Sequence, residues 1–299
     1  MYMDMATAYV LDSFPKVGFP EPGPGTLMEY KAETVKDTIS FGPYITVRWG
    51  QEWPYNNYCY TLIGEKAYAG CVAIAIAQIM SYYRYPERLL ISYDYSNNIE
   101  YLSWENILQH KQSFYSLCAC STSSMSHHQI AQLVRQIGCY VFMDYGAVGD
   151  TIKGGSGAYS EDVYNALDYL GYKSDVFQLY SFEKVLSSLS SQKLIYMRGQ
   201  RPSGGGHAWV IDGAQQITTT RTEYTRPQGS PFWDILEQHI YVDKYNHINW
   251  GWNGACNGYY LSTVFDTSLP HRLDSNSSTT GSINYTINLQ IYPNIEIDN

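Results

Sequence analysis

Residues 70–86 read GCVAIAIAQIMSYYRYP, and this stretch decides how the rest of the chain is interpreted. Apolar side chains follow one another from Cys71 onward, and Pro86 cannot continue a helix because its ring removes an N–H donor and clashes with the preceding turn. The pattern predicts a helix from Cys71 to about Tyr85, packed in the core of a mixed fold. The one chemically reactive side chain in the run stands at its front.

Cys71 has two interpretations. A free cysteine in an apolar helix is commonly a packing residue, because cysteine is among the most buried residue types. In the first turn of a helix, however, unpaired backbone N–H groups and the positive end of the helix dipole favour the thiolate. Gly70, directly before the cysteine, leaves room for the backbone of a substrate. The position makes Cys71 a candidate nucleophile.

A nucleophilic thiol needs a base, and histidine titrates in the right range. Among the seven histidines, His207 is distinguished by the stretch SGGGHAWVIDG, in which three glycines precede it and an apolar strand follows. A rigid strand with an unobstructed approach is suited to hold a base next to a substrate. A hydrogen-bonded structural role is the alternative for this histidine.

Two further stretches carry polar groups suited to the same chemistry. In HINWGWNGACNGYYLS, residues 247–262, Asn249 offers an amide oxygen that can accept the imidazole N–H, and Trp250 can shield that bond from water. Gln51 lies 20 residues before Cys71 and offers an amide N–H to an oxyanion, together with the backbone N–H of Cys71. Packed turns are the alternative interpretation of both stretches.

Composition limits the remaining possibilities. The chain has 299 residues, 44% of them hydrophobic, a formal net charge of −9, and no basic cluster, so nucleic acid is excluded as an expected partner. No apolar stretch reaches the roughly 18 residues of a membrane helix, and no signal peptide is visible. The cysteines show no zinc-binding spacing, so we expect neither a metal nor another cofactor.

Helices are predicted mainly in the first half of the chain and strands in the second. Residues 15–25 are rich in proline and glycine and indicate a linker. Further helices are predicted over residues 126–139 and over 160–172, the latter with Ser160 as its N-cap and Gly171 as its stop. Apolar, β-branched runs after residue 193 indicate strands. The predicted fold class is α+β, a helical N-terminal lobe and an antiparallel sheet lobe with a cleft between them.

The order Gln51, Cys71, His207, Asn249–Trp250 resembles the papain-like cysteine peptidases. In that group about 130–150 residues separate the cysteine from the histidine and asparagine, and here the separations are 136 and 178. More specifically, GCVAxAxAQIMxYxxYP, GQxxPYN at 50–56, WxNIL at 104–108, MDYG at 143–146, GGHAxVIDG at 205–213 and NWGWxG with NGYY at 249–260 are similar to the streptopain family of bacterial peptidases. The resemblance extends from about residue 45 to about residue 293.

The resemblance implies a papain-like two-lobed fold and a role for each matching residue. Cys71 would be the nucleophile, His207 the base and then the acid, and Gln51 a donor in the oxyanion hole. Asn249 and Trp250 would organise the histidine. The same resemblance places five residues along the substrate: Ser156, Gly157, Gly205, Gly206 and Trp252.

The chain also departs from the family pattern. Residues 215–241 are an insertion that we expect to form a hairpin or flap near the active site. Only about 45 residues precede the matched region, fewer than a long propeptide needs. The expected organisation is therefore a 1–45 N-terminal extension or linker, a possible propeptide remnant, and a 46–299 peptidase domain.

The implied function is a secreted, cell-surface or periplasmic bacterial endopeptidase of the virulence-associated, zymogen-forming type. It would act as a monomer on protein or peptide substrates and be controlled by a propeptide or protein inhibitor. Two alternatives stay open at this point. The same thiol and imidazole can serve an amidase or acyl transferase acting on cell-wall or other peptides, and an inactive binding homologue can retain the fold.

Overall fold

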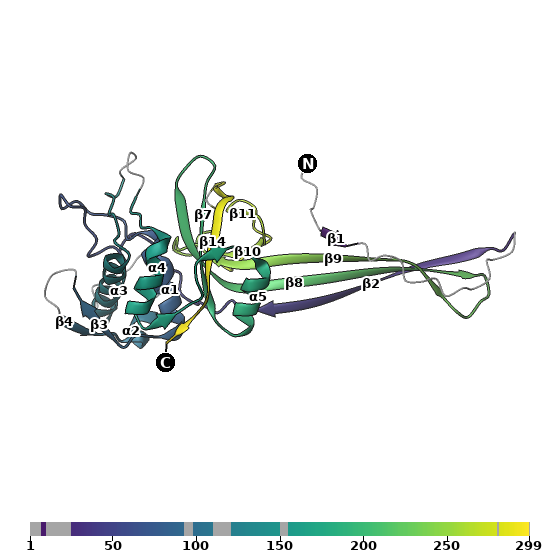
Figure 1. The fold of residues 1–299 in the computed structure, drawn as a ribbon, viewed down its shortest axis with the longest axis horizontal. Helices are drawn as coiled ribbons and strands as arrows, with labels where there is room; N and C mark the ends of the chain where they lie inside the picture. The colour runs from purple at the N-terminus through teal and green to yellow at the C-terminus, as the bar shows by residue number, and fades with distance from the viewer. Residues whose placement is uncertain are drawn as a thin grey trace. The chain divides into compact units, whose positions relative to one another are not determined.

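The structure is a computed structural model, and it describes residues 7–9, 25–92, 98–109, 121–149, 155–279 and 281–298 (Figure 1). The chain divides into two compact units. Unit 1 combines Met1–Ser40 with Gln215–Tyr245, and unit 2 combines Phe41–Ala214 with Asn246–Asn299. The two segments of unit 1 are therefore distant in sequence, and they meet through strand pairing.

Unit 1 is a ribbon of paired strands. Strand β2 (Met28–Phe41) pairs with β8 (Gly206–Pro227), which pairs with β9 (Asp234–Asn249), and the short β1 (Thr7–Tyr9) pairs with β9. The hairpin predicted for the 215–241 insertion is thus confirmed as β8, a turn and β9. Its role as a flap or lid stays a prediction, as does the domain boundary near residue 45.

Side chains tie the N-terminal segment to the inserted hairpin within unit 1. Arg226 pairs with Glu29 at 2.6 Å, and its guanidinium lies 4.3 Å from the centre of the Trp233 ring. Lys31 lies 5.0 Å from the same ring. A ring between two cations stabilises both by cation–π attraction, and each such contact contributes about 0.5–1 kcal/mol at exposed sites. The N-terminal extension and the insertion consequently form one structural unit.

Unit 2 contains most of a ten-stranded sheet of order β12-β10-β9-β8-β7-β14-β5. Its central pairs are antiparallel, with His207 of β8 opposite Gly199 of β7. The further sheet strands are β5 (Tyr172–Lys173), β6 (Gln178–Leu179), β7 (Leu194–Gln200), β10 (Gly258–Leu261), β12 (Arg272–Leu273) and β14 (Ile287–Ile297). Two small sheets are formed by β3 (Arg88–Ile91) with β4 (Asn98–Tyr101) and by β11 (Phe265–Asp266) with β13 (Asn284–Tyr285).

Helix α1 (Cys71–Tyr83) is the centre of the helical part of unit 2. Ten consecutive residues, Val72–Ser81, are buried, which is the pattern of a helix surrounded by other elements. It contacts both α3 (Ser121–Tyr140) and β7 (Figure 1). The remaining helices are α2 (Trp104–Gln109), the 3₁₀ turn η1 (Ser160–Asp162), α4 (Val163–Tyr169) and α5 (Phe182–Ser190).

Two predicted helix ends differ from the structure. The first helix ends at Tyr83 because Arg84 adopts a left-handed conformation, φ 53°, two residues before Pro86. Ser160 is not a capping residue. It is buried, and its hydroxyl shares a 2.7 Å hydrogen bond with the Tyr196 hydroxyl, so it is unavailable to a helix end.

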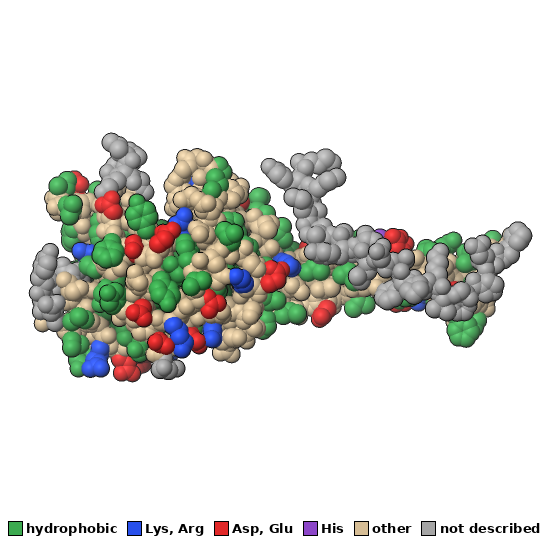
Figure 2. Space-filling model, in the orientation of Figure 1, with side chains coloured by type: hydrophobic (Ala, Val, Ile, Leu, Met, Phe, Trp, Pro, Cys, Tyr) green, Lys and Arg blue, Asp and Glu red, His purple; other side chains and the backbone are tan. Residues whose placement is uncertain are grey.

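The observed architecture is a mixed helix and sheet fold with an antiparallel sheet, which confirms the coarser part of the predicted α+β class. The division into two lobes stays a prediction. Among the described residues, no helix has the length and apolar character required to cross a membrane. On the face drawn in Figure 2, acidic and basic side chains are interspersed.

Candidate active site

A cavity of about 500 Å³ in unit 2 brings together residues from five separate parts of the chain. Six of the ten predicted site residues line it: Gln51, Cys71, Ser156, Gly206, His207 and Trp252. The other lining residues are Glu52, Tyr68, Gly155 and Asn253, none of which the sequence reasoning selected. Glu52, Gly155 and Asn253 each adjoin a predicted site residue in the chain, and this adjacency is their signal in the sequence. Tyr68 adjoins none of the predicted residues.

Cys71 is the first residue of α1, as the sequence predicted. Burial raises the pKa of its thiol, and the backbone amides of Ala208, Val72 and Cys71 itself act in the opposite direction. Nearby backbone amides thus partly offset the effect of burial on the thiol. These donors stabilise negative charge at the sulfur or on an atom bonded to it.

Gly70 shapes the approach to this thiol. Its φ of 89° is unfavourable for any residue with a side chain, and a Cβ atom there would lie 2.6 Å from Sδ of Met143. The carbonyl of Gly70 accepts the first helical bond, from the N–H of Ile74 at 3.1 Å. Glycine is therefore favoured here by the positive φ of the turn into α1, whereas the flexible end of Met143 can move aside.

His207 is the second residue of β8 and is held by a main-chain group. Its Nε2 lies 2.8 Å from the carbonyl oxygen of Trp250. A carbonyl can only accept, so Nε2 carries the proton and Nδ1 of the neutral ring keeps a free lone pair. Burial lowers the pKa of His207 to about 4, opposed by the Trp250 carbonyl. At neutral pH the imidazole is accordingly a base with Nδ1 as its acceptor atom.

Aromatic rings surround the imidazole. The Trp252 ring centre lies 4.6 Å away, and the rings of Trp250, Trp209 and Tyr285 lie within 5.7–6.1 Å in nearly parallel orientations. Trp209 and Tyr285 were not among the predicted site residues. Trp209 has a sequence signal, since it follows His207 by two residues and so lies on the same face of the strand. Tyr285 comes from β13 and has none.

Asn249 does not make the predicted contact with the imidazole. Its amide nitrogen donates to the carbonyl of Val47 at 2.9 Å, and its amide oxygen accepts from the N–H of Gly251 at 3.2 Å. Both groups are thus used to fix the turn around Trp250. The hydrogen-bond partner of His207 is instead the main-chain carbonyl of Trp250. Asn249 fixes the backbone around Trp250 through its bond to Gly251.

Gln51 is positioned by its own backbone. Its carbonyl accepts from the N–H of Ala69 at 2.8 Å, two residues before Cys71. The neighbouring Asn253 N–H donates to Trp49 at 3.0 Å, which attaches the Trp252–Asn253 wall to the same segment. The predicted oxyanion donor and the predicted nucleophile therefore line one cavity, on segments joined by hydrogen bonds.

The predicted substrate-contact residues divide into two groups. Ser156 lines the cavity, and its hydroxyl also donates to the Tyr68 carbonyl at 2.6 Å. Gly206 lines it as well. Gly157 and Gly205 do not line it: Gly157 exchanges two backbone bonds with Asp144, and Gly205 faces Arg201.

The other thiols lie in different surroundings. Cys59, Cys139 and Cys256 are thiols rather than disulfide partners, and the pKa of Cys59 is raised to about 11 by burial. Cys118 and Cys120 fall outside the described residues. Within the described ranges, no cluster of three or more histidine, cysteine, aspartate or glutamate side chains is arranged to hold a metal ion.

A buried ion cluster lies on the strands that carry the site. His247 of β9 contacts Asp212 of β8 through Nδ1 at 2.6 Å and Asp274 through Nε2 at 2.9 Å. Asp212 also accepts from the N–H of Ile45 at 2.9 Å. Burial alone lowers the pKa of His247, but the two carboxylates outweigh burial and raise it to about 9. Charged His247 therefore joins three segments.

Stability is expected to depend on this cluster at alkaline pH. An ordinary histidine has a pKa of 6.5, so charged His247 stabilises the fold fully below that pH and ceases to do so as the pH rises through about 9. Urea unfolding at pH 6 and pH 9.5 should show a decrease of roughly 3 kcal/mol in the parent. His247→Gln should lose most of this difference, and the control His239→Gln should keep it. An equal difference in all three proteins would contradict the assignment.

Comparisons with known proteins agree with this geometry. The model of the peptidase C10 family matches residues 49–260. Streptopain of Streptococcus pyogenes is 30% identical over 234 residues, covering 70% of this chain and 49% of streptopain. The thiol protease/hemagglutinin PrtT of Porphyromonas gingivalis is 25% identical over 240 residues, covering 75% of this chain and 24% of that protein.

A solved structure shares the fold. Active wild-type interpain A, a cysteine protease of Prevotella intermedia, aligns with a TM-score of 0.53 and 22% identity, over 84% of this chain and 93% of that one. The chain spans about half the length of the streptopain it matches. The family match covers well over half of the chain and includes every predicted catalytic residue, so the resemblance stated from the motifs is confirmed. The chain belongs to the peptidase C10 family.

Proposed function

We propose that this chain is a cysteine endopeptidase, with Cys71 as nucleophile and His207 as general base and then acid. One observation carries the proposal: the thiol at the start of α1 and an imidazole whose Nε2 is held by the Trp250 carbonyl line the same cavity. The family membership supports it independently.

The mechanism follows from the protonation states. Neutral His207 accepts the Cys71 proton at Nδ1 as the sulfur attacks the peptide carbonyl carbon, and the tetrahedral oxyanion forms. In this proposal the amide of Gln51 and the N–H of Cys71, both of which line the cavity, donate to that oxygen. Protonated His207 gives its proton to the leaving amine, a thioester remains on Cys71, and water activated by His207 hydrolyses it. Trp250 keeps the imidazole in one tautomer throughout.

The test of this function is cleavage of an unfolded protein. Reduced, alkylated casein incubated with the chain should yield fragments cut at internal peptide bonds, located by mass spectrometry. A peptide epoxide inhibitor should stop the reaction and add to Cys71. Hydrolysis confined to cell-wall peptides or side-chain amides would favour the amidase alternative, and absence of any turnover would favour an inactive homologue. Either outcome contradicts the proposal.

Gln51→Ala is expected to lower kcat by about 10²–10³ with little change in KM, because an oxyanion donor acts more strongly in the transition state than in the ground state. The variant should keep its melting temperature and its rate of alkylation at Cys71. Steady-state kinetics, thermal unfolding and iodoacetamide labelling measure the three quantities. A kcat within about threefold of the parent would remove Gln51 from the mechanism.

Three expectations drawn from the resemblance stay predictions within this proposal. They are export to the cell surface, the periplasm or the medium, control by a propeptide or protein inhibitor, and a monomeric state. The substrates are proposed to be proteins or peptides. The virulence association stays a prediction of the same kind.

A further inference from the structure

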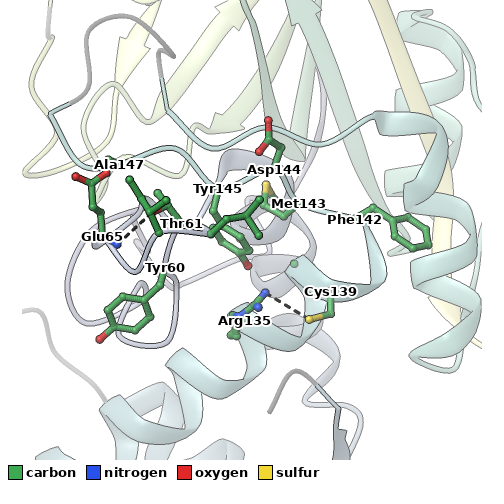
Figure 3. Close-up of a pocket in the computed structure, with 13 residues that line it drawn as sticks. Tyr60, Thr61, Glu65, Arg135, Cys139, Phe142, Met143, Asp144, Tyr145 and Ala147 are labelled. Carbon is green, nitrogen blue, oxygen red and sulfur yellow. Dashed lines mark hydrogen bonds between the residues drawn. The ribbon is translucent and has the colours of Figure 1, made fainter. Parts of the chain in front are cut away.

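A second cavity, of about 610 Å³, lies in unit 2 (Figure 3). It is formed by the turn between Tyr60 and Lys66, the C-terminal part of α3 and residues 142–147. None of the residues assigned above to the proposed chemistry lines it. The proposed mechanism therefore does not involve this cavity.

The rim of the second cavity carries large apolar side chains in solvent. Leu62 is fully exposed, Ile63 is 81% exposed, and Phe142 is 78% exposed. Leu62 and Ile63 occupy the corner of a turn closed by the bond from the Gly64 N–H to the Thr61 carbonyl at 3.0 Å. Apolar side chains gathered at a concave site, rather than scattered singly, are typical of a surface that binds another molecule.

Phe142 is held in place by an unusual backbone. Its φ of 48° is left-handed, a conformation that is uncommon for a bulky residue. The turn is fixed by bonds from the Phe142 N–H to the Cys139 carbonyl at 3.1 Å and from the Met143 N–H to the Gly138 carbonyl at 2.8 Å. A phenylalanine at such a position offers no local benefit to the turn, which suits asparagine or glycine better. The residue lines the edge of the cavity with most of its side chain in solvent.

The floor of the cavity is ordered. The Arg135 guanidinium lies 4.7 Å from the centre of the Tyr145 ring, and its Nη1 donates to Sγ of Cys139 at 3.4 Å (Figure 3). Glu65 and Asp144 also line the cavity, so acidic groups accompany the arginine. These charges give the cavity no strong preference for an anion or a cation. The distinguishing property of the cavity is its apolar rim.

The wall of the second cavity is also part of the wall of the candidate active site. Asp144 lines the second cavity and exchanges two backbone bonds, 2.8 and 2.9 Å, with Gly157. Next to this pair, Ser156 lines the active-site cavity and accepts a bond from the Gly146 N–H at 3.1 Å. Met143 lines the second cavity and closely approaches Gly70, the neighbour of Cys71. One short segment therefore separates the two cavities.

We propose that the second cavity is a distal subsite that binds an apolar side chain of the polypeptide substrate, several residues from the bond that is cut. The proposal rests on the proposed peptidase function. The Asp144–Gly157 pairing joins the walls of the two cavities, so one short segment lies between a chain held at Cys71 and the second cavity. An extended chain advances about 3.3 Å per residue, and a few residues suffice to span such a segment. The occupant is then the same chain that the active site holds, with a phenylalanine- or leucine-like side chain in contact with Leu62, Ile63 and Phe142.

The experiment uses internally quenched peptides with one shared core around the scissile bond. Each is extended by about four residues on the amino or the carboxyl side, with either phenylalanine or serine in the extension. In the parent protein, phenylalanine on one of the two sides should raise kcat/KM about tenfold over serine, through a lower KM, because an apolar side chain becomes buried. A ratio near one on both sides would overturn the proposal.

Variants test whether the apolar rim of the second cavity causes the preference for phenylalanine. Leu62→Ser combined with Phe142→Asn should bring the phenylalanine-to-serine ratio close to one, and asparagine suits the left-handed turn, so the fold is retained. The control Leu179→Ser removes an exposed leucine from β6 and should keep the parent ratio. An unchanged ratio in the double variant would overturn the distal subsite while the core peptide is still cleaved. Absence of core cleavage together with absence of labelling at Cys71 would overturn the peptidase function as well.

Discussion

Cys71→Ala is expected to lower the rate of peptide hydrolysis by at least about 10⁴-fold, because the covalent route through a thioester disappears with the sulfur. Labelling by a peptide epoxide should disappear at the same time. Alanine is smaller and helix-favouring, and the residue begins α1, so the fold should be retained. Hydrolysis of a quenched peptide and intact-mass spectrometry measure both effects in one preparation.

Cys256→Ala is the matched control. Cys256 is a buried thiol, and it lines neither of the two cavities. This variant should hydrolyse peptides and react with the epoxide as the parent does. Residual hydrolysis in Cys71→Ala above about 1% of the parent rate would contradict a nucleophilic role, given how large the expected loss is. Epoxide addition to Cys59 in the parent would contradict it as well.

His207→Gln is expected to lower kcat by at least about 10³-fold, since His207 is the imidazole that lines the cavity with Cys71 and a glutamine amide cannot take up the thiol proton. Glutamine keeps an amide N–H that can donate to the Trp250 carbonyl, and it fills much of the space between the aromatic rings. Alkylation of Cys71 by iodoacetamide at pH 7 should become slower. The pH dependence of both rates, measured by stopped-flow and mass spectrometry, separates a base from a packing residue.

The control for this variant is His239→Gln, on the ribbon of unit 1, where the histidine pairs with Glu237. It should leave kcat and the alkylation rate at the parent values. Unchanged alkylation in His207→Gln, with a lower melting temperature, would mean that His207 is a structural residue. Loss of kcat with a retained melting temperature and slower alkylation would support the proposed base.

Local sequence was sufficient to predict secondary structure and burial where residues close by in the chain determine them. The apolar run after Gly70 predicts a buried helix with Cys71 at its start, and the structure confirms this, because a helix without a polar face has to be enclosed. The insertion at residues 215–241 is expected to form a hairpin or flap, and β8 and β9 pair as a hairpin. Family motifs place Gln51, His207 and Trp252 at one site, and all three line the cavity.

The tertiary structure decided which residues contact one another. Sequence reasoning gave the imidazole to the amide of Asn249, but a main-chain carbonyl of Trp250, 43 residues from His207, accepts that bond. Every residue has a main-chain carbonyl, so the amino-acid type does not predict which carbonyl will accept a hydrogen bond from a histidine. The same limit applies to Tyr285, which reaches the imidazole only because β13 is placed beside it.

What the sequence determined by itself is the chemistry available to this protein: a thiol at a helix start, an imidazole at a strand start, amides near both, and a family. What only the tertiary structure decided is the set of partners: the Trp250 carbonyl for His207, β2 for the inserted strand β8, and the shared wall between two cavities. The physical reason is that helix and hairpin signals act over a few residues, whereas these contacts join segments far apart in the chain. Their geometry is fixed by packing of the whole unit, and no local pattern encodes it.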